Sequence, residues 1–409
     1  MPVELSSLVH PADTRIVLVV MDGLAGFADG GRGSELEEAA TPNLDRLAAT
    51  GTTGLLEPVG PGITPGSGPA HLGLFGYDPS VFVLGRGALS AAGLDVELKP
   101  GDVAARANLA TLDVDGRVLD RRAGRPSDAE GAEAVRLLSD GVHVDGVEVS
   151  FVHEAQHRVL VVMRGPGLDP GVCDTDPQAV GVPPVTPRAI TPEAEHTAEV
   201  VAEIDRQSRA ALAALEGPMT GLRGPNATTG LLLRGFDSHR ELPTMFDRYG
   251  LEPAAAAVYP MYRGLARLVG MEVLGPPADL SAELTLVADA WTSYDYFFVH
   301  HKGPDSAGED GDFDAKVAAI EALDAVVPDL VDLGPDVLMV TGDHATPSQM
   351  AAHSWHPVPV VMWGPQVGRD PVATFGEGAC LGGALGRRPA ADLMGFALAA
   401  AGRLAKYGA

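Results

Sequence analysis

Short runs of apolar residues recur near both ends of the chain. They are RIVLVVM at 15–21, YFFVH at 296–300, DVLMVTG at 336–342 and VPVVMWG at 358–364. Runs this short and this uniformly apolar are typical of parallel strands buried on both faces. Segments with helical spacing separate them, namely TPNLDRLAATG at 41–51, DAKVAAIEALDAVV at 314–327 and AADLMGFALAAAG at 390–402. The alternation predicts an α/β unit with a mainly parallel sheet flanked by helices.

The middle of the chain has a different pattern. It carries its own apolar strand, HRVLVVMRG at 157–165, and a long amphipathic helix, EAEHTAEVVAEIDRQSRAALAAL at 193–215. Proline-rich segments such as GVPPVTPRAITPEAE at 181–195 separate these pieces. We therefore predict a smaller α/β domain at 87–251, inserted into a discontinuous domain formed by 1–86 and 252–409.

Charge and composition narrow the class of protein. The 29 Lys and Arg residues face 55 Asp and Glu residues, which gives a formal net charge of −26. Such a chain repels nucleic acid and anionic membranes, so an anionic substrate needs a local group of arginines or metal ions. The two cysteines, the amino terminus and the absence of an apolar run of roughly 20 residues predict a cytoplasmic enzyme.

Ligand-type residues gather at the ends of the predicted strands, where open α/β sheets bind ligands. Carboxylates and imidazoles suit divalent cations, and two ions would offset the repulsion among several carboxylates. One Asp alone is typical of a helix cap, and one His alone of a structural hydrogen bond. The conjunction predicts a site for two divalent ions, formed by Asp22, Asp305, Glu309, Asp343, His344 and His353.

The stretch TPGSGPAHLG at 64–73 places one serine between two glycines before a short helical segment. Ser67 has two interpretations. Serine is a favoured helix N-cap, and most serines in that position do nothing else. A serine beside a metal site can instead be a nucleophile, because a metal ion lowers the pKa of its hydroxyl.

Several motifs together resemble one family. The motifs are VVMDG, TPNLDRLAATG, TPGSGPAHLGLFGYDP, DRRAGR, VYPMYRGLARLVGM, DSAGEDGDF, TGDHATP and AHSWHPVPVV. They resemble the archaeal-type cofactor-independent (2,3-bisphosphoglycerate-independent) phosphoglycerate mutases of the alkaline phosphatase superfamily, from the first strand almost to the carboxyl terminus. The resemblance implies an alkaline-phosphatase-like α/β fold, and interconversion of 3- and 2-phosphoglycerate in glycolysis through a phosphoserine.

The resemblance also implies roles for individual residues. Ser67 would be the nucleophile, and in that mechanism Lys302 would neutralise phosphoryl charge. Asp174 in the motif CDTDP is a candidate acid/base group, with a turn residue as the alternative. Asp22, Ser67, Asp343 and His344 would hold one metal ion, and Asp305, Glu309 and His353 the other. Many relatives have His where this chain has Glu309, which either shifts the preference towards Mn²⁺ or Mg²⁺, with Zn²⁺ or Co²⁺ as alternatives, or weakens that site.

Arginines would bind the phosphate and carboxylate of the substrate, because a guanidinium group matches both. For any one of them the alternative is a solvated surface charge. The predicted set is Arg106, Arg121, Arg122, Arg125, Arg158, Arg234 and Arg263.

Three other functions remain open at this stage. The same metal domain serves phosphatases and phosphodiesterases. Some family members resemble phosphonoformyl transferases that act on phosphoglycerate, and their acceptor pocket would be nearly identical. A silent metal-binding or regulatory relative is the third alternative, with Glu309 as the sign of lost activity.

Overall fold

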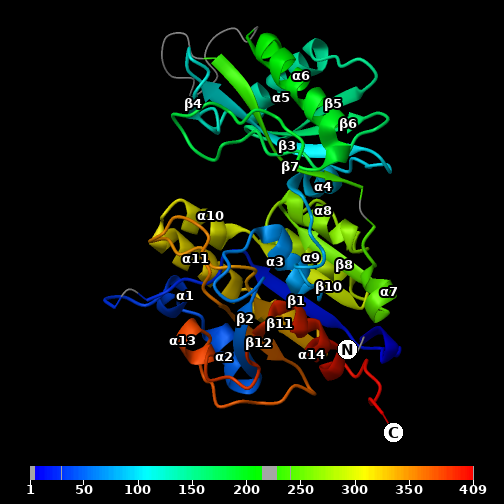
Figure 1. Cartoon of the computed structure of the whole chain (residues 1–409). Helices are drawn as coiled ribbons and strands as arrows, with labels where there is room; N and C mark the ends of the chain where they lie inside the picture. Colours follow the sequence, from blue (N-terminus) through cyan, green and yellow to red (C-terminus); the bar gives the residue numbers. More distant parts are fainter. Residues whose placement is uncertain (1–4, 29, 214–227, 240, 409) are drawn as a thin grey trace. The chain divides into compact units, whose positions relative to one another are not determined.

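The computed structural model describes residues 5–28, 30–213, 228–239 and 241–408. The chain divides into two compact units, which are Met1–Val83 with Leu242–Ala409 (unit 1) and Leu84–Glu241 (unit 2). The chain colours in Figure 1 show that unit 1 contains both ends of the sequence. The division falls after Val83 and Glu241, whereas the sequence predicted it after residues 86 and 251. The helix Met245–Tyr249 (α7) belongs to unit 1, where the Tyr249 hydroxyl donates to the carbonyl of Gly76.

Unit 1 is built on one eight-stranded sheet with the strand order β13-β2-β12-β11-β1-β10-β8-β9. Three of the predicted runs form its centre as parallel strands, which confirms the mainly parallel sheet. The strands are β1 (Ile16–Met21), β2 (Thr52–Glu57), β8 (Pro253–Ala257), β9 (Glu272–Val273), β10 (Tyr296–His301), β11 (Val337–Thr341), β12 (Val358–Trp363) and β13 (Gly386–Pro389).

The fourth predicted run, β12, is not a parallel strand. It is antiparallel to both of its neighbours, β11 and β2. Its first residues therefore lie beside the last residues of β11, with Val360 opposite Thr341. Consequently the segment before β12, which contains His353, reaches the same sheet edge as the segments that follow β1, β10 and β11.

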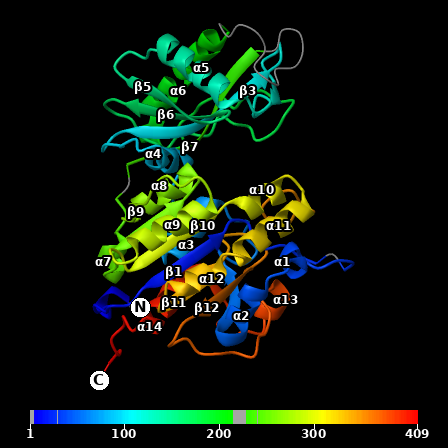
Figure 2. The ribbon, with the colours of Figure 1, turned by 180° about the vertical axis from the view of Figure 1, so that it is seen from behind.

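Helices cover both faces of this sheet. On one face α2, α9, α11 and α12 bury Leu, Ile and Val side chains against β1, β10 and β11, and α9, α11 and α12 are in front in Figure 2. On the other face lie α3 and α14, in front in Figure 1. The α-helices of unit 1 are α1 (Glu35–Glu38), α2 (Pro42–Thr50), α3 (Ser67–Leu74), α7, α8 (Pro260–Leu268), α9 (Leu280–Ala290), α10 (Gly303–Glu309), α11 (Phe313–Asp324), α12 (Val327–Asp332), α13 (Glu377–Cys380) and α14 (Leu393–Ala400).

Unit 2 has an antiparallel five-stranded sheet with the order β4-β3-β6-β5, and β7 pairs with the other edge of β3. Helices α5 and α6 pack on one face of this sheet and α4 on the other. The predicted helix at 193–215 corresponds to α6, and its last two residues lie outside the described ranges. The elements are α4 (Arg86–Gly93), β3 (Val103–Leu112), β4 (Val118–Asp120), α5 (Asp128–Gly141), β5 (Glu148–Ala155), β6 (Arg158–Arg164), α6 (Glu195–Leu212) and β7 (Thr228–Ser238). Short 3-10 turns lie at Leu5–Ser7, Pro192–Ala194 and Ala390–Asp392.

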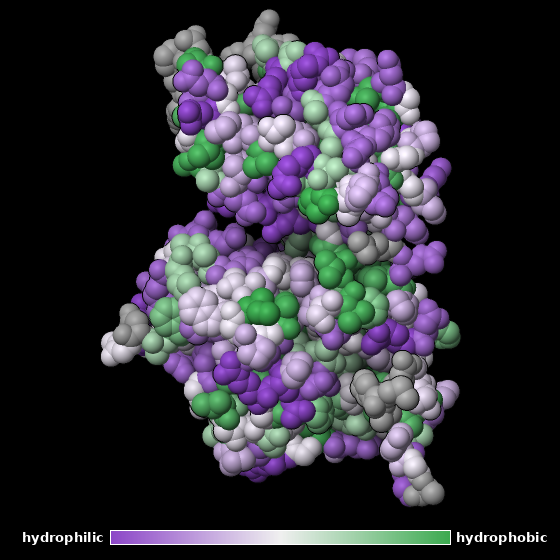
Figure 3. Space-filling model, viewed as in Figure 1, coloured by the Kyte–Doolittle hydropathy of each residue, from purple (hydrophilic) through white to green (hydrophobic). Residues whose placement is uncertain are grey.

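The surface seen in Figure 3 scatters hydrophobic residues in small groups among hydrophilic ones. Within the described ranges, every helix is too short or too polar to cross a bilayer.

One carboxyl group in unit 1 makes stability depend on pH. Glu283 on α9 is fully buried; its Oε1 accepts a hydrogen bond from the Val258 amide at 2.8 Å, and its Oε2 has no partner among the described residues. Burial disfavours the charged form and raises the pKa of Glu283 from 4.5 to about 9. The unfolded chain therefore loses this proton at a lower pH than the folded chain does. The contribution to stability is fully present below the ordinary pKa and is lost as the pH rises towards 9.

We expect Glu283→Gln to flatten this pH dependence. Between about pH 5 and 9 the free energy of unfolding of the variant should fall less steeply, by up to about 1.4 kcal/mol per pH unit. Urea unfolding at several pH values measures it. Equal slopes for the variant and the parent chain would contradict a neutral, buried Glu283.

Candidate metal centre

Four segments of unit 1 bring their polar residues to one edge of the sheet. Asp22 follows β1, Asp305 lies on α10 after β10, and Asp343 and His344 follow β11. His353 arrives from the other direction, just before β12. These side chains form two overlapping groups whose ligand atoms lie within 4.8 Å of one another, which are Asp22, Asp343 and His344, and Asp305, His344 and His353.

His344 is shared by both groups. Its Nε2 lies 3.1 Å from Oδ1 of Asp22 and 3.3 Å from Oδ2 of Asp343. Its Nδ1 lies 3.0 Å from the hydroxyl oxygen of Thr346, which itself donates to Oδ1 of Asp305 at 2.6 Å. Burial disfavours the charged ring, but Asp343 and Asp22 outweigh this effect and raise the pKa of His344 to about 9. The same negative field attracts a cation.

Two buried carboxylate oxygens in the first group have no donor of their own. Oδ1 of Asp22 and Oδ2 of Asp343 accept no well-formed hydrogen bond from the described residues. A buried carboxylate oxygen without a donor is costly, and a bound divalent ion is one way to satisfy it. The donor set of carboxylates and imidazole therefore fits a divalent metal ion.

His353 has the orientation expected of a metal ligand. Its Nδ1 lies 3.0 Å from the carbonyl oxygen of Pro65, which fixes the ring and leaves Nε2 to face Asp305 at 3.6 Å. Ligating histidines usually donate their second nitrogen in this way. The rings of His353 and His344 are stacked, with 3.7 Å between their centroids.

Glu309 lies at the rim of the second group. Its Oε1 is 3.9 Å from Nε2 of His353, and its side chain is 45% exposed. It belongs to neither three-residue group, although it lies one turn of α10 after Asp305. Its assignment as a ligand stays a prediction.

Ser67 is not the cap of its helix. It is the first residue of α3, the cap position is held by Gly66, and no side-chain cap hydrogen bond is formed there among the described residues. The Ser67 hydroxyl instead lies 3.4 Å from Nε2 of His344. The interpretation of Ser67 as the cap was therefore wrong, because the helix already includes Ser67 rather than beginning after it.

Lys302 bridges the carboxylates of both groups. Its ammonium group donates to Oδ2 of Asp22 at 2.9 Å and to Oδ2 of Asp305. Burial disfavours its charge, but Asp22 and Asp305 outweigh this effect and raise the pKa of Lys302. Burial alone would also raise the pKa of Asp22, yet Lys302 and the neighbouring imidazoles hold that pKa well below its ordinary value.

Comparisons with known proteins bear on the whole chain. A family model described as 2,3-bisphosphoglycerate-independent phosphoglycerate mutase matches residues 48–216. A protein of Thermus thermophilus named as a probable mutase of this kind is 46% identical, with 99% of this chain and 98% of that protein covered. One of Deinococcus radiodurans with the same name is 45% identical, with 98% of each covered. This chain belongs to the 2,3-bisphosphoglycerate-independent phosphoglycerate mutase family.

Two solved structures are similar to this chain over almost its whole length. A cofactor-independent phosphoglycerate mutase from Thermoplasma acidophilum has a TM-score of 0.67 and 29% identity, with 95% of this chain and 100% of that chain covered. A protein of Pyrococcus horikoshii has a TM-score of 0.81 and 26% identity, with 97% and 99% covered.

The mutase chain also gathers arginines on one face of the sheet of unit 2. Arg106 on β3 lies directly opposite Arg234 on β7, and Arg158 on β6 is opposite Asn108, two residues along β3. Because alternate residues share a face, these three arginines project from the face opposite α5 and α6. The positive charge of this face acts on His157, since burial and then Arg158 and the neighbouring arginines lower the pKa of His157 to about 3.

The predicted arginines do not all have the same surroundings. Arg121 makes two hydrogen bonds to the carboxylate of Asp176, at 2.8 and 2.7 Å, so its charge is already matched. Arg122 and Arg125 are exposed in the turn after β4. Arg263 lies in unit 1 and donates to the carbonyl of Val258 at 2.7 Å.

Two other residues complete the cluster in unit 2. Asp174, the predicted acid/base group, accepts a hydrogen bond from the Gly235 amide at 2.7 Å, next to Arg234. Arg86 on α4 escaped the sequence analysis. Burial and then the charges of Arg106 and Arg234 lower the pKa of Arg86, so Arg86 lies near these two arginines. The motif GRG before a helical run was the only signal that could have indicated it.

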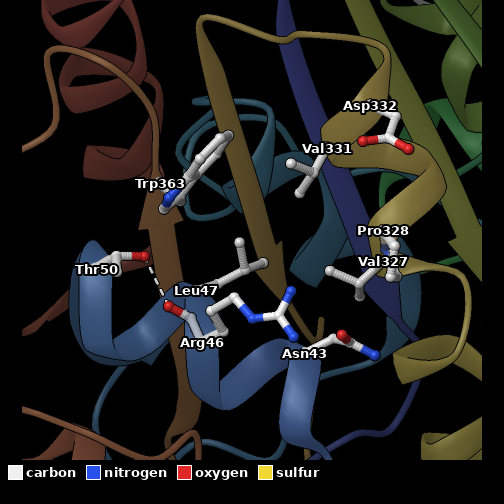
Figure 4. A pocket seen from close by; sticks show the side chains of 9 residues that line it. All are labelled: Asn43, Arg46, Leu47, Thr50, Val327, Pro328, Val331, Asp332 and Trp363. Atoms are coloured by element: carbon white, nitrogen blue, oxygen red, sulfur yellow. Dashed lines mark hydrogen bonds between the residues drawn. The ribbon is translucent and has the colours of Figure 1, made fainter.

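Unit 1 also has an apolar pocket of about 460 Å³ away from the metal ligands. Figure 4 shows side chains of α2, α12 and Trp363 around it, with the Arg46 guanidinium at its rim. Trp363 ends the antiparallel strand β12, so this pocket lies at the opposite edge of the sheet from His353. Its described lining contains neither of the two groups of candidate metal ligands.

Proposed function

We propose that this chain interconverts 3-phosphoglycerate and 2-phosphoglycerate, with Ser67 as the transient phosphoryl acceptor. The observation that carries the proposal is the position of the Ser67 hydroxyl. It lies 3.4 Å from Nε2 of His344, beside two buried carboxylates, and it makes no capping bond that would explain the serine otherwise. The names of the relatives support phosphoglycerate as the substrate.

We assign the two groups of ligands to two divalent ions, most simply Mn²⁺ or Mg²⁺, because oxygen ligands predominate. Asp22, Asp343 and His344, with Ser67 beside them, would hold one ion. Asp305, Glu309 and His353 would hold the other. Ions in these places would lower the pKa of the Ser67 hydroxyl and offset the negative charge of the phosphate.

The two phosphoryl transfers depend on side chains of this chain. In the first half-reaction a bond forms between Oγ of Ser67 and phosphorus while the bond from phosphorus to the 3-oxygen of glycerate breaks. In the second half, the 2-hydroxyl of the same glycerate attacks the phosphoserine and Oγ leaves. Lys302 neutralises charge on the phosphoryl oxygens during both transfers. Asp174 is proposed to exchange protons with the glycerate oxygens.

The arginine face of unit 2 is proposed to bind the anionic groups of the substrate. Arg106 is 8% exposed and lies in register with Arg234, so it is held in place by the sheet. We expect Arg106→Met to raise KM for 3-phosphoglycerate about 10- to 100-fold, since a charged hydrogen bond contributes about 1.5–3 kcal/mol. Steady-state kinetics measures it.

Arg136 provides the matched control for this variant. It lies on α5 of the same unit, is exposed, and pairs with Glu133 and Asp140. Arg136→Met should leave KM unchanged. An unchanged KM in Arg106→Met, with the variant folded, would contradict the assignment of this face to substrate binding.

The proposed activity is tested by a coupled assay. Protein loaded with Mn²⁺ is given 3-phosphoglycerate alone, and 2-phosphoglycerate is detected with enolase while free phosphate is measured in parallel. We expect 2-phosphoglycerate without free phosphate and without any nucleotide. Phosphate release would indicate a phosphatase, and a requirement for a nucleotide donor would indicate a transferase.

A further inference from the structure

A layer of three buried rings lies directly against the metal ligands. The rings belong to His71 on α3, Tyr262 on α8 and His300 on β10, and each side chain is at most 1% exposed. The rings of Tyr262 and His300 are stacked, with 3.6 Å between their centroids. The His71 ring lies 4.7 Å from Tyr262 and 5.2 Å from His300. The first group of ligands therefore packs on a layer of buried aromatic rings that carry polar atoms.

Each ring directs a polar atom at a carboxylate of the first group. The Tyr262 hydroxyl donates to Oδ2 of Asp22, and Nε2 of His300 lies 3.3 Å from the same oxygen. Nδ1 of His71 lies 3.2 Å from Oδ2 of Asp343. If this layer only filled space, Phe and Leu side chains would be more favourable there, because burying an imidazole costs free energy.

His71 alone in this layer also reaches the serine. Its Nδ1 lies 2.9 Å from the carbonyl oxygen of Ser67, one helical turn earlier. Both neighbours of Nδ1 are acceptors, so Nδ1 carries the proton. Nε2 is buried and has no partner among the described residues. The Nδ1–H group is therefore directed at the backbone of Ser67, while Oδ2 of Asp343 lies 3.2 Å from the same nitrogen.

We propose that His71 is a positioning residue that fixes the first turn of α3, and with it the Ser67 hydroxyl, relative to Asp343. The inference rests on the proposed function, because it gives Ser67 and Asp343 the roles described above. It adds that the nucleophile and the first metal ion are aligned through an imidazole that contacts the backbone of Ser67 and the carboxylate of Asp343. Second-layer partners of this kind commonly contribute 10- to 100-fold to metal affinity or activity.

Substitution of His71 by Asn or by Gln tests the roles of the two ring nitrogens separately. In His71→Asn the side-chain NH₂ group takes nearly the place of Nδ1, whereas in His71→Gln it takes nearly that of Nε2. His71→Leu removes both ring nitrogens and keeps the apolar volume. We expect His71→Gln and His71→Leu to lower Mn²⁺ affinity about 10- to 100-fold, and His71→Asn to stay within a few-fold of the parent chain.

The full-length chain is titrated with Mn²⁺ by calorimetry, and kcat and KM are then measured at saturating Mn²⁺. Because Ser67 is displaced as well, kcat should remain lowered in the Gln and Leu variants while KM for 3-phosphoglycerate changes little. Phe75→Leu is the control for simple loss of packing. Phe75 is the C-cap of the same helix, and its ring centroid lies 5.0 Å from that of Phe298 and 6.2 Å from that of His71, without a polar atom that reaches a carboxylate. It should lower the melting temperature and leave Mn²⁺ affinity unchanged.

The inference would be overturned if the Gln variant had the same Mn²⁺ affinity and the same kcat as the parent chain. A His71→Asn variant whose Mn²⁺ affinity and kcat are as low as those of His71→Gln would overturn it too, since the position of the donor would then not matter. The Asn and Gln pair decides the question even where the Leu variant does not fold. A parent chain that binds Mn²⁺ but makes no 2-phosphoglycerate would refute the proposed function and leave the comparison of affinities intact.

Discussion

Replacing Ser67 by alanine is expected to abolish turnover of 3-phosphoglycerate while leaving the protein as stable as before. The loss of kcat should be about 10⁴-fold or more, because the other hydroxyls beside these ligands, those of Tyr262 and Thr346, already donate to Asp22 and Asp305, whereas the Ser67 hydroxyl is the proposed acceptor. A capping serine would behave in the opposite way. Its loss would cost about 1 kcal/mol of stability and little activity.

The two outcomes are read from steady-state kinetics and thermal unfolding of the same preparation. Since Gly66 holds the cap position and no side chain bonds the helix amides, the melting temperature should not fall. A Ser67→Ala chain that is active but less stable would return Ser67 to the role of a structural residue.

Removal of divalent metal is expected to have the second large effect. Chelation should abolish activity, and Mn²⁺ or Mg²⁺ should restore it. It should also lower the melting temperature, because Asp22 and Asp343 are fully buried and each has an oxygen without a hydrogen-bond donor. At a metal concentration 100 times the dissociation constant, binding stabilises the fold by about 2.7 kcal/mol.

Asp343→Asn should reproduce the effect of chelation at ordinary metal concentrations, since it removes one negative charge from the first group. Asp140→Asn is the matched control, because Asp140 is an exposed residue of α5 that pairs with Arg136. Full activity after exhaustive chelation, confirmed by metal analysis, would refute the metal-dependent account.

The central strands were predictable because each is a continuous apolar run buried on both faces. β1, β10 and β11 have no exposed residue except the half-buried end of β10. β8 (Pro253–Ala257) escaped prediction because four alanines in a row favour a helix, and only its place between β10 and β9 makes it a strand. The direction of a strand could not be predicted either, since β12 has the same apolar pattern as the parallel strands β1, β10 and β11.

The candidate site followed from residue type and position relative to the strands. Asp22, Asp305, Asp343 and His344 come after strands, so their convergence was predictable from the topology of a parallel sheet. His353 precedes its strand and converges only because β12 is antiparallel. The position of His71 between Ser67 and Asp343 could not be predicted, because its contact with Asp343 joins α3 to the segment after β11, 272 residues later in the chain.

The phosphoserine is the most direct test of the account. Metal-loaded protein is mixed with 3-phosphoglycerate carrying a radioactive phosphoryl group, turnover is stopped with acid, and the labelled peptide is identified by mass spectrometry. The account predicts label on Ser67 in the parent chain, and none in Ser67→Ala or after chelation. Formation of 2-phosphoglycerate with the label on another residue, or turnover that persists in Ser67→Ala, would contradict it.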